Sequence, residues 1–225
     1  MSFNQGNPGR ADISSRCHLN NSVQLKSLQY IHFGYSYCDG LTDQSYDYVR
    51  RCLQRLKLLK EIDLGLHHCS ALTDIGLQNL SKGLKRCILL QKIIIRSAHC
   101  PNITDAGFLC ISQGLKRLTS LKRAKFDFTE CFNITDLGLE SLSDALKRLI
   151  LLEGLYLGFG FCGQITDRGI HNIDKTIQSL PRLKEVMLGF STCRNITSKG
   201  RRKIDEIEKK YPSVQKRFQG FWQNY

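Results

Sequence analysis

Two histidine–cysteine groups are the residues of this sequence whose types suggest chemistry. His67-His68-Cys69 and His99-Cys100 recur one after the other along the chain, and imidazole and thiolate are ligands that zinc prefers. A zinc site also needs a closed ligand set at about 2.0 to 2.3 Å. The sequence has no paired CxxC motif, no HExxH motif and no glycine-rich phosphate-binding loop. We therefore interpret these groups as histidines at a solvent-exposed edge beside buried cysteines, and expect neither a metal nor a cofactor.

A repeat with a period of 31 residues surrounds these groups and runs without insertion through the chain. Its most regular element is a pair that begins with threonine: Thr42-Asp43, Thr73-Asp74, Thr104-Asp105, Thr135-Asp136, Thr166-Asp167 and the degenerate Thr197-Ser198. A cysteine lies four residues before each threonine: Cys38, Cys69, Cys100, Cys131, Cys162 and Cys193. A fixed period across six copies indicates a stacked solenoid. Because an active site needs one special place, six equal places predict a protein that is not an enzyme and has no small-molecule substrate.

Each repeat changes its apolar periodicity near the cysteine. Before the cysteine, Ile93 and Ile95 lie two residues apart, which is the spacing of a strand. After it, Leu139, Leu142 and Leu146 recur at helical spacing. Each helix is expected to begin at the Thr-Asp pair, where side-chain oxygens accept hydrogen bonds from the first backbone N–H groups and the acid suits the helix dipole. The glycine three residues after most of these threonines is expected to let the helix pack close to the neighbouring turn.

The recurring apolar, cysteine and Thr-Asp positions resemble the leucine-rich repeat, specifically its cysteine-containing class, over residues 28–211. That class has the pattern LxxLxLxxC followed by a hydrophobic residue, Thr-Asp and Gly-Leu, although the cysteine arrives two residues later here. The resemblance implies an α/β horseshoe with parallel strands on the concave face and helices on the convex face. We divide the chain into an irregular N-terminal cap (1–24), six repeats (25–211) and an aromatic cap or docking tail (212–225). Phe218, Phe221, Trp222 and Tyr225 belong to that tail.

The ten cysteines are predicted to be free thiols. Six share one position of the repeat, so they should stack about 5 Å apart as small apolar side chains in a narrow slot. Cys52, Cys87 and Cys110 fall in predicted helices, where cysteine replaces a small hydrophobic residue. Unpaired thiols favour a reducing compartment. The first residues lack the apolar core of a secretory signal, and no apolar stretch is long enough to span a bilayer. We expect a cytoplasmic protein, with the mitochondrion as the alternative.

The strand residues between the core positions are predicted to form a partner-binding face on the concave side, because they differ from copy to copy. One row is His32, Asp63, Ile94, Lys125, Tyr156 and Met187, and it is flanked by Tyr30, Glu61, Lys92, Arg123, Gly154 and Glu185. The alternative is a merely solvated sheet face.

A basic stripe is predicted at the C-terminal ends of the helices. It consists of Lys85, Arg86, Lys116, Arg117, Lys147 and Arg148, extended by Arg55, Lys209 and Lys210. Cations stabilise this end of a helix. The formal net charge of +13 exceeds what that role requires and indicates an acidic partner: a nucleic acid, an anionic lipid surface or an acidic protein.

The function that follows is a non-catalytic protein-interaction scaffold or adaptor. Cysteine-containing repeats are familiar in F-box receptors of cullin ubiquitin ligases; residues 1–24 are too few for an F-box, so the resemblance implies an adaptor-like relative at most. A short basic repeat protein is also similar to mitochondrial assembly factors related to ATP synthase subunit s. The competing function is a basic structural subunit of a large complex that contacts RNA or acidic protein.

Overall fold

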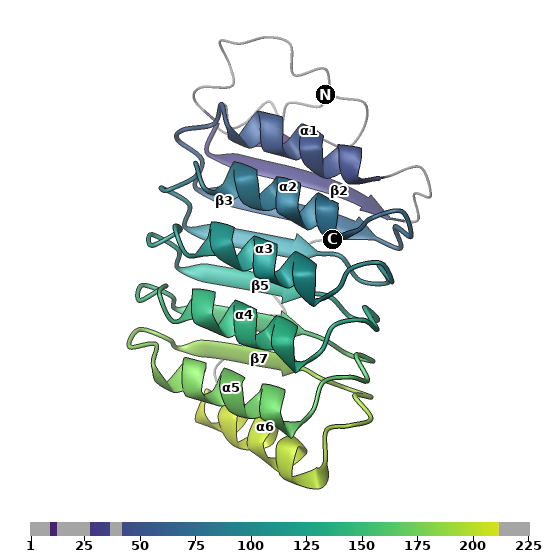
Figure 1. The fold of residues 1–225 in the computed structure, drawn as a ribbon. Coiled ribbons are helices and arrows are strands. Elements are labelled where there is room, and N and C mark those ends of the chain that lie inside the picture. Colours follow the sequence, from purple (N-terminus) through teal and green to yellow (C-terminus); the bar gives the residue numbers. More distant parts are fainter. Residues whose placement is uncertain (1–9, 13–27, 37–41, 212–225) are drawn as a thin grey trace.

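Strands and helices alternate in a computed structural model that describes residues 10–12, 28–36 and 42–211 (Figure 1). The strands are β1 (Arg10–Asp12), β2 (Tyr30–Ser36), β3 (Glu61–His67), β4 (Lys92–Arg96), β5 (Arg123–Asp127), β6 (Gly154–Gly158) and β7 (Glu185–Gly189). The helices are α1 (Asp43–Leu53), α2 (Asp74–Leu84), α3 (Asp105–Leu115), α4 (Asp136–Leu146), α5 (Asp167–Gln178) and α6 (Ser198–Lys210). The strands form one parallel sheet in chain order.

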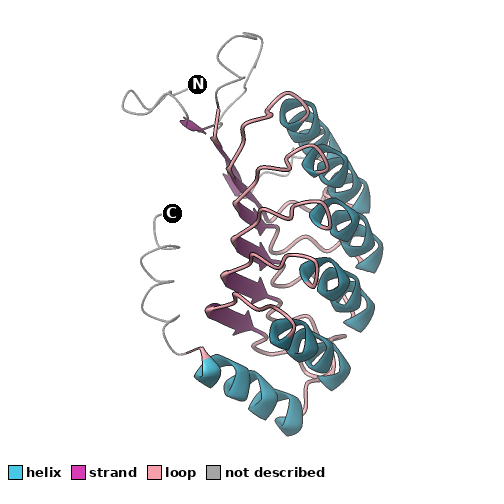
Figure 2. Ribbon diagram, turned by 90° about the vertical axis from the view of Figure 1, so that its left-hand side faces the viewer, coloured by secondary structure: helices cyan, strands magenta, loops and turns pink. Residues whose placement is uncertain are grey.

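The sheet curves, with the strands along its inner, concave side and the helices along its outer, convex side (Figure 2). The predicted α/β horseshoe is therefore confirmed. One difference lies in the N-terminal segment, where β1 pairs in parallel with β2 although the sequence indicated no strand there. The predicted aromatic tail lies outside the described residues, as does Cys38. No helix in the described part of the chain is long and apolar enough to cross a membrane.

The core fills the layer between the sheet and the helices. Ile93 and Ile95 of β4 point into it, as do Leu139, Leu142 and Leu146 of α4, and all five are fully buried. The strand register aligns equivalent residues of successive repeats, so each apolar position becomes a continuous row. Three phenylalanines just before the cysteine turns add an aromatic stack, Phe128, Phe159 and Phe190, and Phe108 of α3 packs against the first two.

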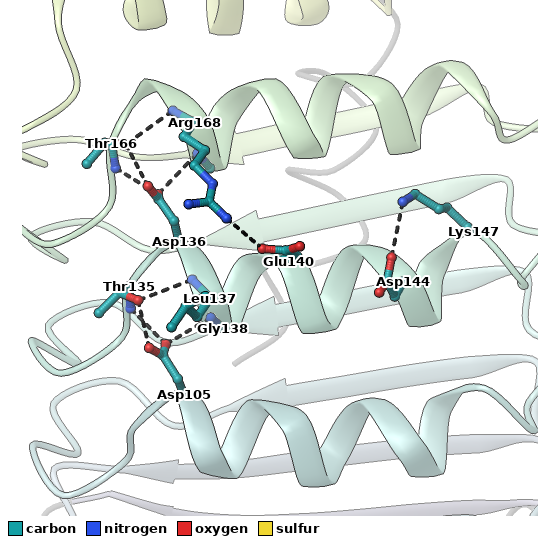
Figure 3. Close-up of polar contacts among 11 residues, drawn as sticks. Asp105, Thr135, Asp136, Leu137, Gly138, Glu140, Asp144, Lys147, Thr166 and Arg168 are labelled. Atoms are coloured by element: carbon teal, nitrogen blue, oxygen red, sulfur yellow. Dashed lines mark hydrogen bonds and ion pairs between the residues drawn. The ribbon is translucent and has the colours of Figure 1, made fainter.

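The threonine of each Thr-Asp pair caps its helix, as predicted. In α4, Thr135 Oγ1 accepts a hydrogen bond from the backbone N–H of Leu137 at 3.1 Å (Figure 3). The six N-caps are Thr42, Thr73, Thr104, Thr135, Thr166 and Thr197.

The aspartate of each pair does more than complement the helix dipole, because it binds the cap of the next repeat. Asp105 Oδ1 accepts from the backbone N–H groups of Thr135 and Gly138, both at 2.9 Å, and Asp105 Oδ2 accepts from Thr135 Oγ1 at 2.6 Å (Figure 3). We call this series the Asp–Thr ladder: Asp43–Thr73, Asp74–Thr104, Asp105–Thr135, Asp136–Thr166 and Asp167–Thr197. Charge-assisted hydrogen bonds of this kind contribute about 1.5–3 kcal/mol each. The ladder therefore joins neighbouring helices along the whole solenoid.

Glycine is required beside the ladder, and Gly138→Ala should lower the free energy of unfolding by about 2 kcal/mol. A Cβ at Gly138 would lie 2.6 Å from Asp105 Oδ1 and 3.2 Å from Ile134 Cγ2. The short Asp105 side chain is held by its hydrogen bonds to Thr135 and Gly138, so making room for the methyl group breaks them. The roughly 1 kcal/mol that alanine gains over glycine in a helix offsets only part of that loss. Urea denaturation followed by circular dichroism measures the difference.

Gly163→Ala is the matched control, because nothing lies within 4 Å of a Cβ added there. Its stability should be unchanged or raised by up to about 1 kcal/mol. Equal stability of the two variants would show that the close approach at Gly138 is easily relaxed.

The cysteine turns close each strand onto the following helix. Cys131 is fully buried, and its Sγ donates to the carbonyl oxygen of Ser97 in the preceding repeat at 3.2 Å. Cys100, Cys162 and Cys193 repeat this contact with Leu66, Phe128 and Phe159. The thiols thus satisfy backbone acceptors as well as filling space. The eight cysteines of the described residues form no disulfide bonds. Cys87 differs from the prediction, since it follows the end of α2 and is not in a helix.

In the five described cysteine turns, the residue before the cysteine has a left-handed backbone although none is glycine. The φ angles are 55° at His68, 56° at His99, 61° at Glu130, 62° at Phe161 and 58° at Thr192. This conformation turns the N–H of His99 toward the carbonyl oxygen of Thr129 in the next repeat, at 2.9 Å. The hydrogen bond compensates a backbone conformation that is costly for side chains with a Cβ.

Candidate partner-binding face

The register of the sheet assembles the predicted binding row on the concave side. His32 lies opposite Asp63, Asp63 opposite Ile94, and the row continues through Lys125, Tyr156 and Met187. The flanking row of Tyr30, Glu61, Lys92, Arg123, Gly154 and Glu185 lies two residues earlier on each strand. Side chains two apart on a strand share a face, so both rows belong to one surface.

A third row shares this surface and was missed by the sequence analysis. It contains Arg96 and Asp127, opposite each other at the ends of β4 and β5. His67 is the last residue of β3 and lies two positions after Gly65, the β3 residue of this row. The same two-residue alternation that gave the first two rows indicates these positions. They were overlooked because the equivalent residues in other repeats are mostly glycine: Gly34, Gly65, Gly158 and Gly189.

Polar side chains of the three rows bind one another across strands. Arg96 Nη2 lies 2.6 Å from Asp63 Oδ1, which joins the third row to the first. Lys125 Nζ lies over the ring of Tyr156, 4.4 Å from its centroid, in a cation–π contact. The two contacts occupy neighbouring strands, β3 to β6, and form the centre of the face.

A longer ion pair crosses two strand spacings in the flanking row. Arg123 Nη1 lies 3.1 Å from Glu185 Oε2, although β6 separates their strands. Gly154 occupies the position between them, and a Cβ there would meet Glu185 Oε2 at 3.4 Å. Glycine therefore leaves the room in which the arginine and the carboxylate meet.

The central residues are more buried than a row of outward-pointing side chains suggests. Asp63 is 4% exposed, Ile94 3% and Lys125 9%, while His32, Tyr156 and Met187 are half-buried. Burial lowers the pKa of Lys125, and burial followed by the neighbouring Arg96 charge lowers the pKa of His67. Burial raises the pKa of Tyr156 to about 12. The side chains of the face are thus packed against one another and do not extend singly into solvent.

The histidine–cysteine groups separate in space into an outer and an inner part. The rings of His68 and His99 stack at 3.9 Å, and His99 Nδ1 lies 2.8 Å from Glu130 Oε2. Cys69 and Cys100 are buried in the core. Histidines at an edge beside buried cysteines are what the sequence indicated. Among the described residues no three His, Cys, Asp or Glu side chains are grouped as metal ligands.

The predicted basic stripe lies at the helix C-termini, on the edge where each helix turns back to the sheet. Lys85, Lys116 and Lys147 are the C-cap residues of α2, α3 and α4. The arginine that follows each lysine is exposed in the turn: Arg86, Arg117 and Arg148. The stripe and the concave rows are therefore separate surfaces.

The fold and its stacked, parallel repeats define a leucine-rich-repeat type of α/β solenoid. No protein-family profile matches the chain, and no curated protein sequence matches it. Two solved structures are similar in fold. The C-terminal domain of tropomodulin from Caenorhabditis elegans superimposes with a TM-score of 0.52 at 14% identity, over 80% of this chain and 99% of that one. Actin-binding site 2 of leiomodin-1 gives a TM-score of 0.51 at 16% identity, over 80% and 96%.

Proposed function

We propose that this chain is a non-catalytic protein-interaction scaffold that binds a partner protein on its concave strand face. The observation that carries the proposal is the contrast between two kinds of position in one repeat. The Asp–Thr ladder and the core rows use nearly the same residues in every copy, whereas the first concave row has a different residue in each: His32, Asp63, Ile94, Lys125, Tyr156 and Met187. A face whose residues differ from repeat to repeat is suited to binding a single, irregular protein surface.

The packed state of the face supports the same function. Interface residues that contribute most to binding are enriched in tyrosine and arginine and are held in place before the partner arrives. Tyr156 and Arg96 have this character, because Lys125 and Asp63 hold them. The similarity in fold to actin-binding site 2 of leiomodin-1 makes actin the first defined protein to test.

The free thiols support a reducing, intracellular location, which is part of the proposal. None of the eight described cysteines forms a disulfide bond, and seven are buried. Together with the LxxLxL-type strand and the Thr-Asp turn, they favour the cysteine-containing class of leucine-rich repeats. An adaptor role, of the kind that such repeats have in substrate receptors, fits a chain whose concave rows differ from repeat to repeat.

Lys125→Glu combined with Tyr156→Ala should abolish capture of the specific partner and weaken its binding at least tenfold. The substitutions remove the cation–π contact and reverse a charge at the centre of the face. Affinity capture from native cells, with mass spectrometry of wild-type and variant eluates, identifies the partner. Titration of the purified pair, with actin as the first defined arm, measures the affinity.

The matched control is Lys175→Glu with Gln113→Ala, two exposed substitutions on the convex helices α5 and α3. It should retain the partner at wild-type affinity. Retention of the partner by the concave variant, with circular dichroism unchanged, would place the binding site elsewhere. Partner-independent turnover of a substrate by the purified chain would contradict the scaffold function itself.

A further inference from the structure

The five turns that lead from a helix to the next strand carry most of the net positive charge of the chain. We call them the helix-to-strand edge: residues 54–60, 85–91, 116–122, 147–153 and 178–184. They contain twelve lysines or arginines and one acid, Glu153, which is a net +11 of the formal +13. The turns follow one another along one side of the solenoid (Figure 1), and Figure 2 looks directly onto that side.

Helix capping explains only part of this charge. The lysines at the C-caps complement the negative helix ends, and Lys147 pairs with Asp144 at 3.1 Å. Arg86, Arg117 and Arg148 lie one residue further, are exposed, and have no acidic partner among the described residues. Three uncompensated guanidinium groups in register therefore attract an anionic surface.

Aliphatic side chains are exposed in the same turns. Leu58 is 47% exposed, Ile88 56%, Leu89 43% and Ile150 57%. Each follows a basic residue of its own turn by one to three positions: Leu58 follows Lys57, Ile88 and Leu89 follow Arg86, and Ile150 follows Arg148. The edge contains no aromatic residue, so it lacks the stacking platform with which proteins bind single-stranded nucleic acid. Exposed aliphatic residues among cations match the chemistry of a lipid surface, where headgroups are anionic and the layer beneath is apolar.

We propose that the helix-to-strand edge docks on an anionic phospholipid surface. Arg86, Arg117 and Arg148 lie among the headgroups, and Leu58, Ile88, Leu89 and Ile150 enter the boundary of the acyl layer. At the spacing of parallel strands the five turns span about 20 Å, which is enough for several headgroups. Docking through this side leaves the concave face accessible to a protein partner, so this inference goes beyond the proposed function and does not depend on it.

Vesicle flotation of the full chain tests the proposal. Phosphatidylcholine vesicles with about a third of phosphatidylserine are compared with pure phosphatidylcholine vesicles at about 0.1 M salt. Wild-type protein should float with the anionic vesicles only. The charge variant Arg86→Glu, Arg117→Glu, Arg148→Glu should bind at least a hundredfold more weakly, because each cation near the surface contributes about a fivefold factor and three are lost. The aliphatic variant Ile88→Ser, Leu89→Ser, Ile150→Ser should bind about tenfold more weakly.

The control carries the same change in net charge on the opposite edge and α6: Arg194→Glu, Lys199→Glu and Arg202→Glu, all exposed. It should stay within about threefold of wild type, since screening confines the attraction to nearby charges. Equal losses for the control and the charge variant would overturn the proposal in favour of unspecific attraction. Wild-type affinity of the aliphatic variant, or binding to a single-stranded RNA of matched charge but not to vesicles, would also overturn it.

Discussion

Raising the pH from 8 to 10 should lower the free energy of unfolding by about 5 kcal/mol. The cause is the set of thiols buried in the core. Burial raises the pKa of Cys87 and of Cys162 to about 12 and that of Cys100 to about 11, and it raises the pKa of Cys131 as well. The ordinary value for these thiols is 9.0.

The sign of this effect follows from proton binding. A thiol whose folded pKa lies above its unfolded pKa holds its proton more tightly in the native state. Its contribution is fully present below pH 9 and is lost as the pH rises through the folded value. Each thiol therefore costs about 1.4 kcal/mol of stability per pH unit above 9, and four act together. Burial of Tyr46, whose pKa is also raised, adds to the loss above pH 10.

Urea titrations at pH 8, 9 and 10 measure the loss, and Cys131→Ala shows its origin. Removing one buried thiol should reduce the fall between pH 8 and 10 by about a quarter. Cys110→Ala is the matched control, because Cys110 is only partly buried on α3. At pH 8 a thiol reagent should react slowly with the native protein and rapidly once urea unfolds it. A pH-independent stability, or rapid labelling of Cys100 and Cys131 in the folded state, would contradict the burial of the thiols.

Phe128→Ala should lower the free energy of unfolding by about 3–5 kcal/mol. Phe128 is fully buried and contacts rings from two other repeats. Its centroid lies 4.7 Å from that of Phe108 in an edge-on contact, and 6.2 Å from that of Phe159 in a stacked one. Alanine leaves a cavity between repeats that are held in place by the repeats on either side of them. The surrounding side chains therefore cannot move enough to fill the cavity.

Phe132→Ala is the control for this substitution. Phe132 lies only four residues away but is 50% exposed, so its removal should change stability by less than about 0.5 kcal/mol. Phe128→Leu, which fills more of the cavity, should fall between the two and remains measurable if the alanine variant unfolds. Equal losses at positions 128 and 132 would show that the aromatic stack does not stabilise the solenoid.

The sequence predicted the strands and helices of the repeats, but not β1, because the repeat elements depend on short-range patterns. The two-residue alternation around Ile93 and Ile95 indicated a strand, and Thr135-Asp136 marked the start of a helix. The contact of Asp105 with Thr135 was not predictable in the same way, since it depends on how two repeats stack. The left-handed backbone at Phe161 has no signal in residue type, because the equivalent residues share neither size nor charge.

The sequence predicted which residues form the candidate face, but not how buried they are or which of them contact each other. Alternation placed Lys125 and Tyr156 on one surface, which the strand register supports. Their burial and mutual contact depend on the curvature of the sheet, which brings concave side chains together. The sequence of a single repeat does not predict that curvature. The ion pair of Arg123 and Glu185 could not be predicted from contacts between adjacent strands, since β6 lies between their strands. It forms because Gly154 has no side chain to fill the space between them.

The Asp–Thr ladder also has a consequence for how this protein changes in length. Every junction uses the same two residues, so removing residues 105–135 would join Thr104 to Asp136 and recreate a complete Thr-Asp pair. Duplication of one 31-residue unit would likewise add a junction without new chemistry. The series ends at α6, whose first turn contains Ser198 and no acid. A further unit added after α6 would have no carboxylate to hold its cap, so the last helix is the natural boundary for insertion.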